Sequence, residues 1–251
     1  MIALPTPVEG DSGIFLLGKI PLDKIKESIG QKAEIFFLAF DKEENLIDLK
    51  RNAVKLSSIK GKEAYYYSLL NLKPGPYKFR IVMRDMDTGN GAVGRNSMDI
   101  PALQGQGVML YTPLLLNSEK SGLYVRGYVP SKIKSQFPLL DYFPFDPNQF
   151  SPNLGIINGS SGKIQAVLRC SMRNLTNPVL KFTAALIERS SEKTTSLPVT
   201  ILSGKRGDDV GTLFTEFQMP EMTPGEYVLV LTVVDQTSQS RSQTSIPCTL
   251  F

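Results

Sequence analysis

Apolar residues recur along this chain in short segments bounded by Gly, Pro, Asn or Asp. The clearest segment is 77–84, in which two series of side chains alternate. One series is apolar and the other mostly basic: Tyr77, Phe79, Ile81 and Met83 against Lys78, Arg80, Val82 and Arg84. This period of two is typical of a β-strand with one buried face. A helical period is nearly absent, and Lys24–Ile29 is the segment that best fits a turn or two of helix.

The same pattern predicts strands in both halves of the chain. In the first half they cover residues 14–20, 33–40, 46–57, 64–70, 77–84 and 92–100. In the second half they cover residues 108–116, 123–128, 163–170, 179–188, 200–202, 213–219, 227–234 and 244–250. Many short strands with turn residues between them are typical of immunoglobulin-like and fibronectin III-like sandwiches. For a chain of 251 residues we therefore predict an all-β fold of two tandem β-sandwiches, 1–116 and 117–251.

An internal repeat supports two domains. The motif Pro-Gly-x-Tyr opens a strand that ends in Asp in both halves, and the two copies align without a gap. Its residues are Pro74, Gly75 and Tyr77 in the first copy and Pro224, Gly225 and Tyr227 in the second. Pro followed by Gly predicts a tight type II turn at the start of a hairpin. The Tyr is predicted to form a tyrosine corner, with its ring buried and its hydroxyl bonded to backbone.

A polar turn and a last strand follow each copy of the motif. We match Ile100-Pro101 with Ile246-Pro247, so that the spacing between copies falls from 150 to 146 residues and the first turn becomes four residues longer. The first turn, Asp85–Gly91, superficially resembles a calcium loop. Gly occupies the fifth position and no Glu closes the loop, so a polar hairpin turn is favoured.

A Pro- and aromatic-rich segment, 137–162, separates the regular strands of the second half. A long loop of this kind is uncommon in a compact domain. Its aromatics either pack on their own domain or form a recognition surface, because exposed aromatics on a Pro-stiffened loop lose little entropy on binding. The candidate binding residues are Tyr142, Phe143, Phe145 and Phe150. In the strand 64–70 the consecutive rings of Tyr65–Tyr67 should alternate faces, leaving at least one exposed.

Composition excludes several functions. Twenty-eight basic against 24 acidic residues give a net charge of +4 without a basic cluster, which argues against nucleic-acid binding. The chain has no His, the commonest general base and metal ligand, and we expect neither an enzyme nor a cofactor or metal. It has no Trp, which weakens a carbohydrate-binding interpretation without removing it, because Tyr and Phe can also stack on sugars.

The remaining signals concern compartment and context. Cys170 and Cys248 either form a disulfide or are two buried thiols. No segment reaches the roughly 20 apolar residues of a membrane span. The segment 1–7, Met-Ile-Ala-Leu-Pro-Thr-Pro, lacks the features of a signal peptide and is interpreted as a linker within a longer protein.

Part of the first half resembles a known family. The string from Leu72 to Asp85, followed by Thr88-Gly89, Gly94 and the exit Met98–Pro101, is similar to the region after the von Willebrand factor A module in bacterial, acidobacterial-type VWFA-related proteins. The segment Ala33–Asp48 fits the same pattern, and the resemblance covers roughly residues 13–116. The chain has no Asp-x-Ser-x-Ser motif, so the A module itself is missing.

The resemblance implies a part of an exported bacterial protein, located in the periplasm, at the cell surface or outside the cell. We therefore expect a non-catalytic interaction or structural module that binds a protein partner or neighbouring domains through sandwich surfaces or loops. The alternatives are a carbohydrate-binding module, with a glycan as ligand, and an accessory domain of an envelope enzyme.

Overall fold

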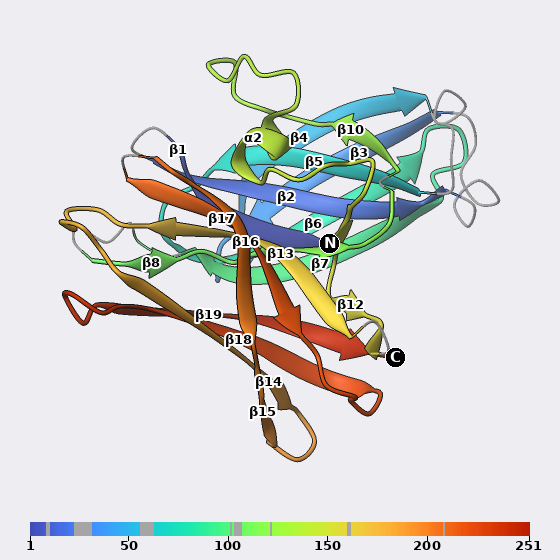
Figure 1. Ribbon diagram of the computed structural model, residues 1–251. Helices are drawn as coiled ribbons and strands as arrows, with labels where there is room; N and C mark the ends of the chain where they lie inside the picture. The colour runs from blue at the N-terminus through green and yellow to red at the C-terminus, as the bar shows by residue number, and fades with distance from the viewer. Residues whose placement is uncertain are drawn as a thin grey trace. The chain divides into compact units, whose positions relative to one another are not determined.

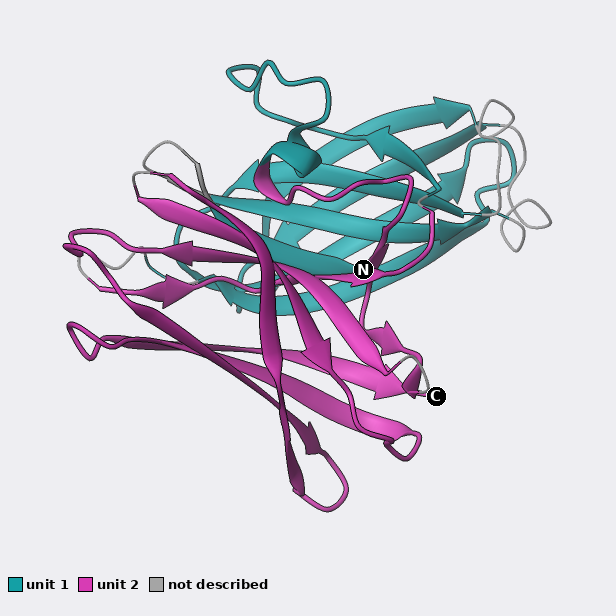
Figure 2. Ribbon diagram, viewed as in Figure 1, with its two compact units in different colours: residues 1–103, 122–141 teal, residues 104–121, 142–251 magenta. Residues whose placement is uncertain are grey.

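The computed structural model describes residues 1–8, 11–22, 32–55, 63–100, 102, 107–120, 122–159, 162–207 and 209–251. The fold is all-β, as predicted, and strands account for most of it (Figure 1). The predicted helix Lys24–Ile29 lies outside the described residues. The chain forms two compact units: unit 1 contains residues 1–103 and 122–141, and unit 2 contains residues 104–121 and 142–251 (Figure 2).

Unit 1 is a sandwich of two four-stranded sheets. The first sheet has the order β1-β2-β5-β10, with strands Ile2–Val8, Asp11–Pro21, Glu63–Asn71 and Leu123–Arg126. The second has the order β4-β3-β6-β7, with strands Leu46–Lys55, Lys32–Phe40, Gly75–Asp85 and Gly91–Ile100. Alternate residues along the strands point into the core between the two sheets. There Phe37 stacks on Tyr66 with 4.9 Å between ring centroids. On β6 the buried series is the one predicted from the sequence, with Phe79, Ile81 and Met83 in the core.

Unit 2 repeats this plan with sheets of six and five strands. One sheet runs β11-β9-β13-β17-β16, with strands Ser151–Asn153, Leu114–Asn117, Lys163–Ser171, Val210–Gln218 and Val199–Arg206, and β8 (Met109–Leu110) also pairs β13. The other runs β12-β19-β18-β14-β15, with strands Ile156–Ile157, Arg241–Leu250, Gly225–Asp235, Leu180–Glu188 and Thr194–Leu197. In unit 1, β1, β2 and β5 share one sheet and β3, β6 and β7 the other; in unit 2, β9, β13 and β17 correspondingly share one sheet and β14, β18 and β19 the other. This partition is that of immunoglobulin-like folds.

The chain passes between the two units more than once. Residues 107–117, all but the last of which the predicted division assigns to the first domain, contribute β8 and β9 to unit 2. Residues 122–141 return to unit 1 as β10 and most of the helix α2 (Pro138–Tyr142). The predicted division at residue 116 therefore differs from the observed one. The reason is pairing: β10 lies parallel to β5, with Tyr124 opposite Tyr65.

The Pro-Gly-x-Tyr motif is a crossover between sheets and not a hairpin turn. It connects β5 to β6 in unit 1 and β17 to β18 in unit 2, and in each case the two strands belong to different sheets. Gly75 has a φ of 141° whereas Gly225 lies outside the positive-φ region, so the predicted type II turn is wrong for the second copy. The predicted hairpin follows one strand later, because β6 pairs β7 and β18 pairs β19.

The hairpin turns of the two copies have equal length. In unit 1 the Asp85 N–H donates to the carbonyl of Asn90, and in unit 2 the Asp235 N–H donates to that of Ser240. The strand after each turn has ten residues and ends at Ile100 or at Leu250. The predicted four-residue difference is wrong, since the two Ile-Pro pairs do not occupy equivalent positions.

The N-terminal segment is a strand, and its interpretation as a linker is corrected. Residues Ile2–Val8 form β1, which pairs antiparallel with β2. Pro5 and Pro7 suggested a linker, but β1 is the edge strand of its sheet. An edge strand tolerates Pro because half of its N–H groups have no strand to bond.

All three rings of Tyr65–Tyr67 are buried, contrary to the expectation that one is exposed. Tyr66 points into the core, and the opposite face of β5 is covered by residues 122–141. Tyr65 stacks on Tyr124 at 5.4 Å, and Tyr67 packs edge-on against Phe137 at 5.8 Å. The covering segment is distant in sequence, so a strand pattern alone does not reveal it.

Candidate functional site

The aromatic segment predicted as a recognition surface is largely packed on unit 2. Phe143 is fully buried, and Tyr142, Phe145 and Phe150 are half-buried. Phe150 packs against Phe214 of β17 with 5.3 Å between ring centroids. The segment 137–162 is also more regular than predicted, since it contains α2, β11 and β12.

Two of these rings stack against a buried arginine. The guanidinium carbon of Arg169 lies 5.0 Å from the Tyr142 ring and 5.8 Å from the Phe143 ring. Burial lowers the pKa of Arg169 to about 10. Such cation–π contacts hold the start of the segment on β13, which favours packing over recognition as the role of these two aromatics.

The two cysteines are free thiols on opposite sheets of unit 2. Cys170 lies on β13 and Cys248 on β19, and both are buried in the unit 2 core. Burial raises the pKa of Cys170 to about 12 and that of Cys248 to about 11. Of the two predicted states, the structure has the buried thiols.

The two motif tyrosines differ in their contacts. The Tyr227 hydroxyl donates to the Thr223 carbonyl at 2.9 Å, and its ring is buried, so the predicted tyrosine corner is present in unit 2. Tyr77 is only half-buried and stacks on Phe79 at 6.1 Å. The motif therefore anchors the sandwich corner through a hydrogen bond in unit 2, whereas in unit 1 its half-buried ring packs against the core.

An exposed surface that combines apolar and basic side chains covers the outer face of the sheet β4-β3-β6-β7. Strand register places four side chains in each of two central rows. We call these two rows the basic face: Leu49, Leu38, Arg80 and Arg95 in one, and Arg51, Phe36, Val82 and Val93 in the other. Leu49 and Val93 are 46% and 44% exposed. Aromatic, aliphatic and arginine side chains in this mixture are typical of protein interfaces.

Two arginines lie directly opposite each other on the basic face. Arg80 of β6 pairs in register with Arg95 of β7, and like charges at such positions destabilise a sheet. Arg80 stacks over the Phe40 ring at 4.6 Å and is influenced by the charge of Glu44, but Glu44 forms its ion pair with Lys78 at 2.6 Å. Among the described residues neither Arg80 nor Arg95 has a carboxylate within ion-pair distance.

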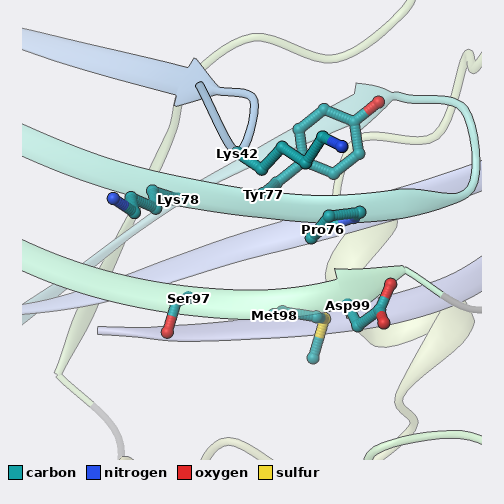
Figure 3. Close-up of a pocket in the computed structure, with 7 residues that line it drawn as sticks. All are labelled: Lys42, Pro76, Tyr77, Lys78, Ser97, Met98 and Asp99. Atoms are coloured by element: carbon teal, nitrogen blue, oxygen red, sulfur yellow. The ribbon is translucent and has the colours of Figure 1, made fainter. Parts of the chain in front are cut away.

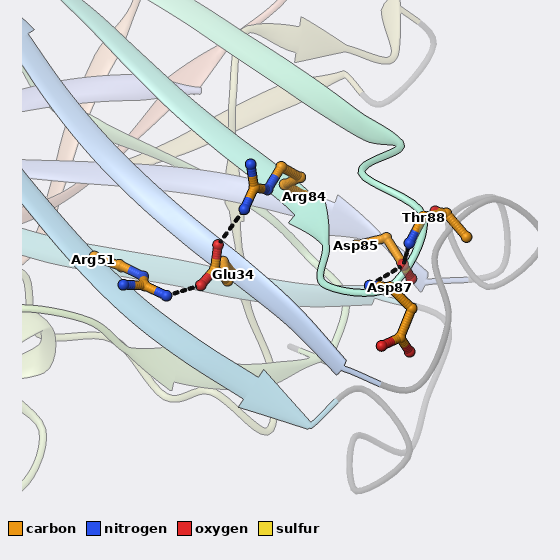
Figure 4. Close-up of polar contacts among 6 residues, drawn as sticks. All are labelled: Glu34, Arg51, Arg84, Asp85, Asp87 and Thr88. Carbon is orange, nitrogen blue, oxygen red and sulfur yellow. Dashed lines mark hydrogen bonds and ion pairs between the residues drawn. The ribbon is translucent and has the colours of Figure 1, made fainter.

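The neighbouring arginines, in contrast, share a carboxylate. The Glu34 carboxylate lies between Arg51 and Arg84 from the two adjacent strands, with 3.0 Å to Arg84 (Figure 4). The hydrogen bond from Arg51 is the largest of the effects that lower the pKa of Glu34. Nearby, the Asp85 carboxylate accepts the N–H groups of the turn, including that of Thr88 at 2.6 Å. Glu34 balances one of the two positive charges of Arg51 and Arg84, whereas Arg80 and Arg95 have no ion-pair partner among the described residues.

A pocket of about 340 Å³ adjoins the basic face at the end of the sheet. Its walls come from the turn after β3, the start of β6 and the end of β7 (Figure 3). They are formed by Lys42, Pro76, Tyr77, Lys78, Ser97, Met98 and Asp99. The half-buried Tyr77 ring gives it an apolar wall, and its two cations are paired, Lys42 with Glu43 at 3.3 Å and Lys78 with Glu44 at 2.6 Å.

The equivalent face of unit 2 has different chemistry. The outward residues of β18 are Val228, Val230, Thr232 and Val234, where β6 has Lys78, Arg80, Val82 and Arg84. Opposite them on β19 lie Pro247, Ser245, Gln243 and Arg241. The two sandwiches thus share a fold but not a surface, and the like-charge pair occurs in unit 1.

Sequence reasoning placed the basic series of 77–84 on one face but did not identify the site. The available signal was the alternation of Lys78, Arg80 and Arg84 along a strand. Arg95 is fifteen residues away from Arg80 in sequence, and only the pairing of β6 with β7 brings them together.

Within the described part of the chain, no cluster of three His, Cys, Asp or Glu residues could hold a metal ion. No described helix is long and apolar enough to span a membrane.

Comparisons with known proteins add little to this description. No protein-family model and no curated protein matches the chain. Among solved structures, CfaE, the adhesive subunit of the CFA/I fimbria of enterotoxigenic Escherichia coli, is similar at 8% identity and a TM-score of 0.24. The match covers 98% of this chain and 79% of that one. At that score the likeness carries no argument about function.

Proposed function

We propose that the chain is a non-catalytic binding module that recognises an acidic protein partner through the basic face of unit 1. The observation that carries the proposal is the pair Arg80 and Arg95, opposed without a carboxylate on an exposed, partly apolar sheet. A partner carboxylate between the two guanidinium groups would remove their repulsion. Arg is also well suited to bidentate recognition of carboxylates.

A protein partner is favoured over an acidic polysaccharide by the neighbours of these arginines. Phe36, Leu38 and Val82 lie in the same two rows and offer apolar area that a polyanion does not use. The resemblance to VWFA-related proteins is consistent with a module of a larger exported bacterial protein, and both the export and the parent are part of the proposal.

A peptide selection tests the proposed function. The immobilised chain is screened against a random peptide library displayed on phage, and enriched peptides are measured by fluorescence anisotropy. We expect enrichment of Asp and Glu interspersed with aliphatic or aromatic residues. The double variant Arg80→Glu, Arg95→Glu should weaken binding at least about tenfold, equivalent to about 1.4 kcal/mol.

The matched control is Lys181→Glu, Arg241→Glu, which reverses two exposed cations on the outer face of unit 2. It should leave the affinity unchanged. Peptides without acidic enrichment, or peptides that bind both double variants equally, would contradict the proposal. Binding of heparin oligosaccharide that survives Phe36→Ala and Val82→Ala would instead assign the face to a polyanionic glycan.

A further inference from the structure

A second feature of unit 1 is an apolar cavity of about 240 Å³ in the sandwich. Its walls include Ile35, Tyr66, Ile81 and Met83, all of which belong to the unit 1 core. Protein cores are close-packed, and voids much larger than a water molecule are few. This cavity opens to the surface, since Lys19, Ala92 and Val93 in its walls are exposed. A space of this size beside core side chains still needs an explanation.

Small residues on facing strands create the space. The inward positions of β7 are occupied by Ala92 and Gly94, and the inward position of β2 beside them is Gly18; all three line the cavity. In unit 2 the residue that pairs with Leu231, as Gly94 pairs with Ile81, is Thr244. Unit 1 thus lacks a side chain where its counterpart has one.

Two charged groups belong to residues of its walls, and one is the α-ammonium of Met1, whose pKa is lowered by burial. The charged side chain in its wall, Lys19, forms an ion pair with Glu63 at 2.6 Å. Tyr66 presents its ring, which stacks on Phe37, and burial is the main cause that raises the pKa of its hydroxyl to about 12. The remaining wall residues are mostly apolar and complementary to an aliphatic group. An engineered apolar cavity of about 150 Å³ in another protein binds benzene, so the available volume is sufficient for a small ligand.

We propose that this cavity is a binding site for the unbranched alkyl chain of a small molecule. The site differs from the basic face, because its core residues point between the sheets and those of the basic face point outward; Val93 alone among the named residues of the basic face also lines the cavity. Either proposal can fail without the other.

The test is a titration of the full chain, carrying ¹³C-labelled Ile and Met methyl groups, with 1-octanol. We expect saturable shifts at the methyl groups of Ile35, Ile81 and Met83, and none at Met109 or Ile246 in unit 2. Hexane-1,6-diol, which is polar at both ends, should produce no saturable shift.

A filling variant provides the second arm. Gly94 is not in the positive-φ region, and a Cβ there would lie 3.4 Å from the nearest atom, the Cβ of Met1, so Gly94→Leu introduces a side chain without backbone strain. It should abolish octanol binding, whereas Ser97→Leu, on the outward side of the same strand, should retain it. Absence of saturable wild-type shifts, shifts outside the cavity, or unchanged binding by a folded Gly94→Leu chain would overturn the proposal. If Gly94→Leu does not fold, the location of the shifted methyl groups in the wild-type chain still decides between these outcomes.

Discussion

At the scale of single residues, the two copies of the motif use the same tyrosine differently. The Tyr227 hydroxyl is bonded to the Thr223 carbonyl at 2.9 Å, and the Thr223 hydroxyl lies 3.1 Å from it. Tyr227→Phe should therefore lower the free energy of unfolding by roughly 1 kcal/mol, the net value of one such bond. Urea unfolding followed by circular dichroism measures the change.

Tyr77→Phe is the matched control, because the Tyr77 ring is half-buried and its described contact is the stacking on Phe79, which Phe preserves. Its effect should be smaller than about 0.5 kcal/mol. An equal loss in the free energy of unfolding for both variants would show that the hydrogen bond from Tyr227 to Thr223 does not contribute the difference between the units.

Acid stability of unit 2 depends on Asp235, which corresponds to Asp85 in the first copy of the repeat. The Ser238 hydroxyl donates to Asp235 at 2.6 Å and the Val179 N–H donates at 2.9 Å, and these bonds lower the pKa of Asp235. Because the folded pKa lies below the ordinary one of 3.8, this stabilisation is complete above pH 3.8 and is lost as the pH falls through the folded pKa.

Asp235→Asn should therefore be less stable than the wild type near pH 7, and its stability should decrease less steeply in acid. Unfolding midpoints in urea between pH 7 and pH 2 test this expectation. Asp87→Asn, at an exposed carboxylate of the unit 1 turn, is the control and should follow the wild-type curve. A parallel curve for Asp235→Asn would show that other groups govern acid unfolding.

At the scale of elements, β10 pairs with β5, and the residues that follow β10 lie close to the β5 backbone. The Gly127 N–H donates to the Tyr67 carbonyl at 2.7 Å, and the Tyr128 N–H donates to the Ser68 hydroxyl at 2.8 Å. A Cβ at Gly127 would lie 2.3 Å from the Ser68 oxygen and 2.7 Å from the Tyr66 oxygen. No side chain fits there without displacing the segment from β5.

Gly127→Ala should consequently cost roughly 1–3 kcal/mol, the usual range for overpacking, and should increase hydrogen exchange at the amides of residues 127 and 128. Gly159→Ala is the control, because its Cβ would meet the nearest atom at 3.5 Å, an ordinary contact. A neutral Gly127→Ala would mean that residues 122–141 are not held as closely as described.

The sequence predicted strand faces well where the information is local. The alternation in 77–84 placed Phe79 and Ile81 in the core because a strand turns each successive side chain to the opposite face. The sequence-based prediction failed where the pairing partners of a strand are distant in sequence. The burial of Tyr65 and Tyr67 depends on residues 122–141, and the opposition of Arg80 and Arg95 depends on register between two strands.

At the scale of the whole molecule, neither unit corresponds to one continuous half of the chain. A fragment ending at residue 116 lacks β10, so it should expose Tyr65 and Tyr67 and bind a hydrophobic dye. A chain in which a short Gly-Ser linker joins residues 1–103 to 122–141 contains all of unit 1. It should give a dispersed amide spectrum and a cooperative unfolding transition.

The second half offers the reciprocal comparison. A fragment starting at residue 117 lacks β8 and β9, which pair with β13 at the centre of its sheet, and should be less soluble than one starting at residue 104 and carrying the same linker in place of 122–141. Independent folding of the fragments 1–116 and 117–251 would contradict the division into these units.

This chain path also constrains synthesis on the ribosome. When residue 103 has left the exit tunnel, the seven strands β1–β7 are available, but the outer side of β5 still lacks its cover. The next residues to emerge belong to the other unit, and only afterwards does the covering segment follow. While residues 104–141 are being translated, the nascent first sandwich therefore exposes Tyr65 and Tyr67, which are buried in the complete protein. During this interval a chaperone can bind β5 before β10 does.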